Sequence, residues 1–570
     1  MNAPTISRGG RFAALGAVLL LLLAVALPSV LKREPGSGDA PGRVGTRSAV
    51  TDGVPADAGP QTFRFYQEYP NTLDPARSAD SYSAGIIAQV YSPLVGLTSD
   101  LEPTPQVAES WIISRDGRRY VFELRPGVRF HNGREVIAAD FVYSLTRLFQ
   151  EPFRSEGLAA TYLDAIAGVP EFVDGKADTI SGIRALDRYR LEITLSRPYE
   201  SLLHALALDQ TSAVPREILE RYGAGGLESH PLGTGPFRFI RREPERSITL
   251  AACRDYFMGP PAIDSLVFYA PPGDVSEAGA DALLNGRATL SVLPSHRIEE
   301  FRARPGLVVL RWQDLSLSFV GMNTSMPPLN DVRVRRAVAL AIDRHAMLRA
   351  RPEGKTMALG VLPPGIPAYT PAAKIPERDV AAAVALLASA GYGPSRPLPP
   401  ITYWASISST KGRMVDSVMV RSLAEAGITL KPRYESWQVL DHAITQRKAG
   451  MFGLAWIADI PDPESFLRSL AFSTSGTNYF EYSSPRVDSL LQRARNTRDS
   501  AIRAACYRDA ELQTIHDAPF IPLFHTASFI GMKENVAGLE MNPLGISTLA
   551  MEKLRFNETT DGHANRHATR

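Results

Sequence analysis

The chain has 570 residues, with 62 Lys and Arg against 60 Asp and Glu, so its formal net charge is +2. This balance argues against a nucleic-acid-binding protein, which would carry a basic patch or stripe. The length allows roughly two to four domains with a substantial buried core. The two cysteines, Cys253 and Cys506, are too far apart in sequence for a metal or redox motif, so we expect two unpaired, buried thiols.

The first 60 residues predict an export segment and a tether. Arg8 and Arg11 precede an almost wholly apolar run at 12–30. This order is typical of an export signal, and the run is about long enough to span a bilayer. Residues 1–31 are therefore predicted to be either a signal-anchor with a cytoplasmic N-terminus or a cleaved signal peptide. Both alternatives make the rest of the chain periplasmic or otherwise extracytoplasmic. Residues 32–60, rich in Gly, Pro, Ala and Ser, predict a flexible linker with a reach of roughly 30 Å.

The predicted fold begins with a strand at 62–66, where apolar and polar residues alternate. Residues 83–91 predict a helix. A turn at 115–118 predicts a hairpin, and Pro126-Gly127 predicts a second one. Asp140 is expected to start the helix that follows.

Apolar residues recur at helical spacing in two later segments, which predicts helices that face a core. They are Val334, Ala337, Val338, Ala341 and Ile342 after a cap at Asn330 or Asp331, and Met414, Val415, Val418, Met419 and Leu423 before a stop at Gly427. Strand-like runs at 402–404 and 452–457 lie between helices, which is the pattern of an α/β lobe. The earlier half of the chain is richer in strands and hairpins, so composition predicts two lobes of different character.

The segment WIADIPDPESF at 456–466 predicts a strand that breaks into a loop. Asp459 directly follows the apolar run, and Pro461 and Pro463 prevent the strand from continuing. Ligands of open α/β sheets bind outside the carboxyl ends of strands, so an acidic group there suits a cationic group on a ligand. The alternative is that Asp459 caps the short helix expected to begin near Pro463.

No motif predicts an enzyme. Gly233-Thr234-Gly235 is followed by a strand-like segment, whereas a dinucleotide loop needs a helix there. The S-x-x-K pattern at 408–411 lacks its partner motifs, and the sequence contains no GxSxG, HExxH or P-loop. His131, His516 and His525 have no cysteine or carboxylate at ligand spacing, so we expect structural histidines. No catalytic residue, metal or cofactor is predicted.

Six blocks, in the same order, resemble family 5 of the solute-binding proteins of ABC transporters, the group with the oligopeptide- and dipeptide-binding proteins. The blocks are 101–145, PLGTGPFRF at 231–239, NDVRVRRAVALAIDR at 330–344, WIADIPDPESFL at 456–467, TNYFEYSSPRVDSLL at 477–491 and HDAPFIPLFH at 516–525. The resemblance runs from about 62 to 556 and implies the large, family 5 variant of the type II periplasmic-binding-protein fold, an α/β fold whose two lobes close like a Venus flytrap.

The resemblance also implies the domain limits. Lobe I would contain 62–312 plus 530–556, and lobe II 313–529. The connections would cross near 310–317 and 524–531. Residues 557–570 are polar and are predicted to form a disordered tail.

The function implied by the resemblance is binding of peptides between the lobes and delivery to permease subunits with their ATPase. In the peptide binders, an Asp at the position of Asp459 pairs with the peptide α-ammonium, and Trp456 and Ala458 occupy places whose backbone meets the extended peptide. The loop Asp80, Ser81 and Tyr82 would face them from lobe I. The position of the Arg that fixes a dipeptide carboxylate falls near Ser406 here, and the absence of this Arg favours longer peptides or a different solute. Trp437 and Tyr403 are expected to pack in the core.

Other ligands and roles stay open from the sequence. The same fold also binds nickel, haem and oligosaccharides, and a membrane-tethered sensor that signals by closure is a further alternative. We expect a monomer.

Overall fold

The computed structural model describes residues 61–156, 159–351, 354–372, 375–406, 410–545 and 548–557. The predicted signal segment, linker and C-terminal tail lie outside these residues. These described residues all belong to one compact unit, and the description below concerns this unit alone.

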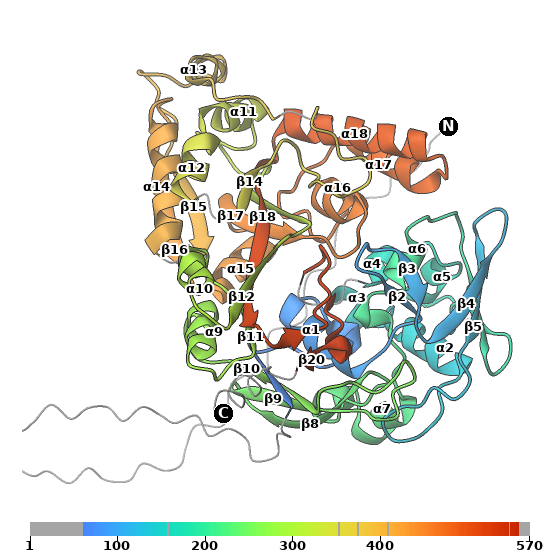
Figure 1. Ribbon diagram of the computed structural model, residues 1–570. Helices are drawn as coiled ribbons and strands as arrows, with labels where there is room; N and C mark the ends of the chain where they lie inside the picture. The colour runs from blue at the N-terminus through green and yellow to red at the C-terminus, as the bar shows by residue number, and fades with distance from the viewer. Residues whose placement is uncertain are drawn as a thin grey trace, which may run out of the picture. The chain divides into compact units, whose positions relative to one another are not determined.

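A twelve-stranded sheet runs through the described residues (Figure 1). Ten strands follow one another in the order β16 (Leu430–Glu435), β15 (Ile401–Ser406), β17 (Met451–Ile457), β13 (Ser316–Met322), β18 (Phe520–Lys533), β11 (Leu290–Val292), β1 (Thr62–Tyr66), β10 (Ser265–Tyr269), β9 (Ser247–Ala252) and β8 (Phe237–Glu243). Two more strands, β12 (Leu307–Gln313) and β14 (Lys355–Met357), pair with β18.

Strand β18 joins the two halves of this sheet. Its first residues pair with β13 and β14, and its residues from Ala527 onward pair with β12 and β11. At 14 residues it is long enough to belong to both halves. The chain also crosses between the halves where β12 is followed closely by β13. Two neighbouring crossings, this one and β18, therefore connect the halves.

Three smaller sheets complete the strands. They are the four-stranded sheet β4 (Ala108–Ile113), β5 (Arg119–Leu124), β7 (Arg190–Thr194) and β6 (Ile183–Ala185), the pair β2 (Val95–Leu97) and β3 (Pro103–Pro105), and the pair β19 (Val536–Ala537) and β20 (Arg555–Phe556).

The α-helices divide at β12 and β13. Those before are α1 (Ser81–Val90), α2 (Ala138–Arg147), α3 (Phe153–Glu156), α4 (Ala159–Leu163), α5 (Val169–Val173), α6 (Leu202–Ala205), α7 (Arg216–Tyr222), α8 (Gly226–Ser229), α9 (Val275–Leu284) and α10 (Ile298–Arg302). Those after are α11 (Val332–Ala341), α12 (Arg344–Ala350), α13 (Val380–Ser389), α14 (Thr410–Ala424), α15 (Trp437–Thr445), α16 (Glu464–Ala471), α17 (Pro485–Asn496) and α18 (Ser500–Asp517).

Two hydrophobic clusters interlock beside the loop that follows β17. Ile460, in this loop, packs into the cluster built on the four-stranded sheet. Conversely, Leu101 of the β2–β3 hairpin packs with Ala458 and Phe466, in the cluster that includes residues of β13 and β17. Burial of these apolar side chains stabilises the loop between two parts of the fold.

Most predicted elements are confirmed. Strand β1 has the predicted limits, and the turn at 115–118 joins β4 to β5 as expected. The helical stripe from Val334 to Ile342 is buried, with Asp331 as the N-cap of α11. Both cysteines are unpaired, although only Cys506 is fully buried.

Two predictions near Pro126 and Asp140 are wrong in detail. Strand β5 does not form a second hairpin across Pro126-Gly127, because its free side pairs with the distant β7. Asp140 is not the first residue of α2 but lies in its first turn, where its carboxylate accepts a hydrogen bond from the Ile137 N–H at 2.9 Å. It therefore caps the helix from inside the first turn.

Candidate functional site

The register of β17 decides which of its backbone groups are available to a ligand. β17 runs antiparallel to β13 with Trp456 opposite Leu317, and the Ala458 N–H donates to the Leu315 carbonyl at 2.8 Å. Because such bonds alternate along an antiparallel pair, the N–H and C=O groups of Trp456 face β13, whereas those of Ala455 and Ile457 face the other way.

On that other side β17 has an open edge. Its neighbour β15 pairs with it only through Met451 and Phe452, among the residues that the structure describes. The backbone groups of Ala455 and Ile457 thus lie beyond the last paired residue, and both side chains are exposed. An unpaired edge of this kind can accept an additional strand.

Asp459 lies two residues beyond this edge and is half-buried. One of its carboxylate oxygens accepts a hydrogen bond from the phenol of Tyr162, on α4, at 2.6 Å. Burial raises the pKa of Asp459 to about 6, and the hydrogen bond from Tyr162 opposes that rise. No ion pair joins Asp459 to a Lys or Arg of the described residues. Above pH 6 it is an anion in a partly dry position without a counter-charge.

The loop after Asp459 is fixed from several sides. The Trp456 indole N–H donates to the Ser465 carbonyl at 2.7 Å, and the Ser465 hydroxyl donates to the Ile460 carbonyl at 3.0 Å. The N-cap of α16 is Pro463, and the carboxylate of Asp462 just before it accepts a hydrogen bond from the Glu464 N–H at 2.9 Å. Asp459 is therefore not the capping residue that the alternative interpretation proposed.

Asp462 also has contacts that the sequence did not predict. It is buried and accepts hydrogen bonds from the Ser201 hydroxyl and the Arg503 guanidinium, each at 2.6 Å. The arginine and this hydroxyl hold the pKa of Asp462 below its usual value despite burial. With Tyr162 and Asp459, these contacts tie the β17 loop to the region that carries the four-stranded sheet.

The second predicted segment lies at the start of α1. Asp80 is the N-cap, and its carboxylate accepts from the backbone N–H groups of Tyr82 at 3.1 Å and Ser83 at 2.8 Å. Ser81 and Tyr82 are exposed. No hydrogen bond or ion pair between described residues joins this segment to Trp456, Ala458 or Asp459.

One functional candidate was missed from the sequence. Tyr162 contacts Asp459 directly, across 297 positions of the sequence. Tyr162 belongs to no motif, and only the tertiary fold brings it to this place. Of the two residues expected in the core, Tyr403 is buried there.

Comparisons with known proteins agree on one family. The model of the bacterial extracellular solute-binding proteins, family 5 Middle, matches residues 102–478. Di/tripeptide-binding protein 2 of Pseudomonas aeruginosa is 29% identical over 526 residues, 87% of this chain and 96% of the relative. Heme-binding protein A of Haemophilus influenzae is 28% identical, over 82% of this chain and 86% of the relative. The solved structure of the periplasmic binding protein DppA from Helicobacter pylori, in complex with peptide STSA, matches with a TM-score of 0.76 at 26% identity, over 87% of this chain and 98% of that one.

Proposed function

The chain belongs to family 5 of the bacterial extracellular solute-binding proteins, and on this premise we propose that it binds peptides for an ABC transporter. The family and the two-lobe α/β fold expected from the sequence are confirmed. The observation that carries the proposal is the open edge of β17 beside the uncompensated carboxylate of Asp459. An extended peptide with a free N-terminus offers a complementary group to each.

The proposed binding mode adds the peptide to β17 as a strand. Backbone groups of Ala455 and Ile457 would pair with the peptide backbone, which explains acceptance of many side chains. The peptide α-ammonium would pair with Asp459. Trp456 would shape the site through its bond to Ser465, and Ala458 through its place in the buried wall.

Lobe I and the end of β15 would bound the rest of the peptide. Asp80 and Ser81 would hold the start of α1 in place, so that Tyr82 faces the ligand. β15 ends at Ser406, where strict dipeptide binders have an Arg, and we propose peptides longer than two residues.

Haem is the second candidate ligand, because Heme-binding protein A is among the relatives. A haem titration followed at the Soret band distinguishes haem binding from peptide binding. A saturable spectral shift that peptides do not compete for would favour haem.

We propose lobes of 62–312 with 530–556, and 313–529, connected where β18 passes from β13 to β12. A ligand that binds both lobes only when they are closed drives closure. Adding a mixture of tri- to pentapeptides is therefore expected to lower the radius of gyration in small-angle scattering. An unchanged radius at saturation would contradict closure.

The proposed location is extracytoplasmic, with the chain acting as a monomer on membrane permease subunits. The proposed location is supported by relatives described as periplasmic. No helix among the described residues is long and apolar enough to cross a membrane, and the run at 12–30 lies outside them. Retention in the membrane pellet after carbonate washing would identify that run as an anchor, and release would identify a cleaved signal.

A further inference from the structure

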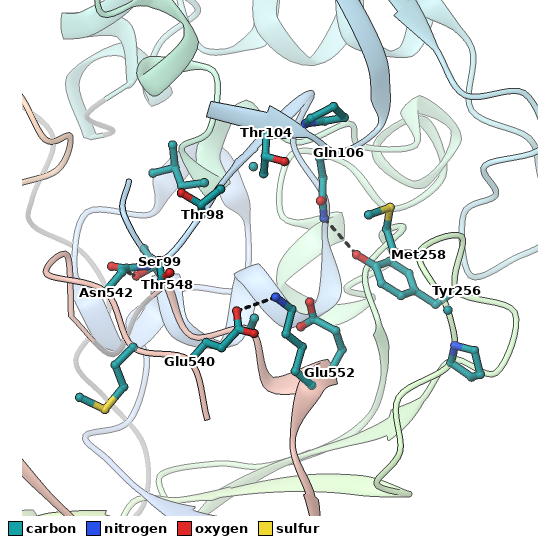
Figure 2. Close-up of a pocket in the computed structure, with 18 residues that line it drawn as sticks. Thr98, Ser99, Thr104, Gln106, Tyr256, Met258, Glu540, Asn542, Thr548 and Glu552 are labelled. Carbon is teal, nitrogen blue, oxygen red and sulfur yellow. Dashed lines mark hydrogen bonds and ion pairs between the residues drawn. The ribbon is translucent and has the colours of Figure 1, made fainter. Parts of the chain in front are cut away.

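A cavity lies apart from the proposed peptide site and is built from residues that take no part in that site (Figure 2). Its walls come from the β2–β3 hairpin, the loop 256–260 after β9, and residues 540–542 and 548–553 between β19 and β20. Its volume is about 520 Å³. This lies within the range of ~300–1,000 Å³ that small-molecule sites occupy.

The walls of this cavity are held to one another and to the core. The Gln106 side-chain amide donates to the Tyr256 phenol at 3.0 Å, which joins the hairpin to the loop. The C-terminal segment is fixed by the Leu315 N–H, which donates to the Pro543 carbonyl at 2.8 Å, and by burial of Leu544. The cavity is therefore a preformed feature of the fold.

The charges in the cavity do not balance. Lys553 pairs with Glu540 at 2.6 Å. Glu552 is half-buried and accepts no hydrogen bond from another of the described residues. Burial raises the pKa of Glu552, and Glu540 contributes to the rise, as expected for two neighbouring carboxylates that share one ammonium. Figure 2 shows both carboxylates at the cavity.

A side-chain amide provides a hydrogen-bond donor at the cavity, independently of these charges. Asn542 is only 8% exposed and lines the cavity. Its oxygen accepts hydrogen bonds from the Leu544 N–H at 2.9 Å and the Thr548 hydroxyl at 2.8 Å. No hydrogen bond between described residues uses its nitrogen. This nitrogen is not enclosed by protein, so as an amide donor in the cavity lining it is available to a ligand acceptor.

We propose that this cavity is a second binding site, for a small polyhydroxylated primary amine. The ammonium would pair with Glu552, and ligand hydroxyls would accept from Asn542 Nδ2 and bond to the hydroxyls of Thr98 and Thr104 across the cavity. The site goes beyond the proposed peptide binding and does not depend on it.

The test is a calorimetric titration of the full chain with glucosamine, with N-acetylglucosamine as the uncharged match. Saturable binding of glucosamine is expected, weaker by about tenfold or more for the acetylated sugar and for Glu552→Gln. Asp459→Asn should bind glucosamine as the wild type does, and Glu552→Gln should keep its peptide affinity.

Three results would overturn the proposal. The first is no saturable binding at glucosamine concentrations up to ~10 mM, and the second is equal affinity for both sugars. The third is loss of glucosamine binding in Asp459→Asn, which would assign the sugar to the peptide site. If Glu552→Gln does not fold, Thr104→Phe tests the same cavity from the hairpin by filling it. Retained glucosamine binding in that variant would also overturn the proposal. Peptide titrations on the same samples test the proposed function separately.

Discussion

Asp459→Asn is expected to weaken binding of a peptide with a free N-terminus by roughly two to three and a half decades. The substitution keeps the size of the side chain and removes its charge. An ammonium left in a closed, dry site without its counter-charge costs about 3–5 kcal/mol. The fold should persist, because the Tyr162 phenol that donates to Asp459 can also donate to an amide oxygen. Isothermal calorimetry measures the difference.

Two controls accompany this variant. Asp178→Asn makes the same chemical change at an exposed residue and should leave the affinity unchanged. Asp462 does not serve as a control, because its contacts with Ser201 and Arg503 tie it to the same loop. An N-acetylated peptide should bind the wild type as weakly as the free peptide binds Asp459→Asn. If Asp459→Asn binds as tightly as the wild type, the ammonium assignment is wrong and a neutral solute is the better hypothesis.

The pH dependence follows from the same carboxylate. The pKa of Asp459 is raised to about 6, and only the ionised form attracts an ammonium. Peptide affinity should therefore be full above that pH and fall as the pH is lowered through about 6. In Asp459→Asn this fall should be absent, which separates Asp459 from other groups that titrate.

Arg495→Met is expected to lower the free energy of unfolding by about 3–5 kcal/mol. The Arg495 side chain is 1% exposed and pairs with the 2% exposed Glu464 at 2.8 Å and with Asp164 at 2.8 Å. Burial raises the pKa of Glu464, and Arg495 is the main group that opposes this rise. Without Arg495, the buried Glu464 carboxylate keeps the more distant Arg468, at 3.4 Å, as a partner. Denaturant unfolding measures the loss.

Two further variants serve as comparisons for the stability loss of Arg495→Met. Arg498 pairs with Glu200 at 2.9 Å, but both side chains are nearly half exposed, so Arg498→Met should cost less than about 1 kcal/mol. Adding Glu464→Leu to Arg495→Met removes both buried charges and should recover much of the stability, because apolar replacements of buried ion pairs are often neutral. Equal losses for Arg495→Met and Arg498→Met would contradict the assignment.

The sequence was most informative where the signal is local. The apolar run before Asp459 predicted β17, and Pro461 and Pro463 predicted its end, since proline cannot continue a strand ladder. The short helix expected to begin near Pro463 is also present, as α16. Each of these depends on a few neighbouring residues.

Distant pairing was not predictable in the same way. The turn residues Pro126-Gly127 suggested a hairpin, yet β5 pairs with β7, more than sixty residues later. Nothing near Tyr162 indicates that it donates to Asp459. Such contacts depend on the packing of whole elements, which no short pattern encodes.

Register had the largest consequence for the candidate site. The resemblance indicated the backbone of Trp456 and Ala458, but the pairing of β17 with β13 directs those groups inward and leaves Ala455 and Ile457 at the open edge. A shift of one residue exchanges the two sets, and the sequence alone does not fix that shift.

The central claim is tested most directly by identifying what the protein carries. The full chain would be expressed with its predicted export segment, purified under native conditions, and denatured to release bound molecules for sequencing by mass spectrometry. Peptides of three or more residues with free N-termini are predicted, and Asp459→Asn should release far fewer. Release of haem, an oligosaccharide or another non-peptide solute, with no peptides, would contradict the account.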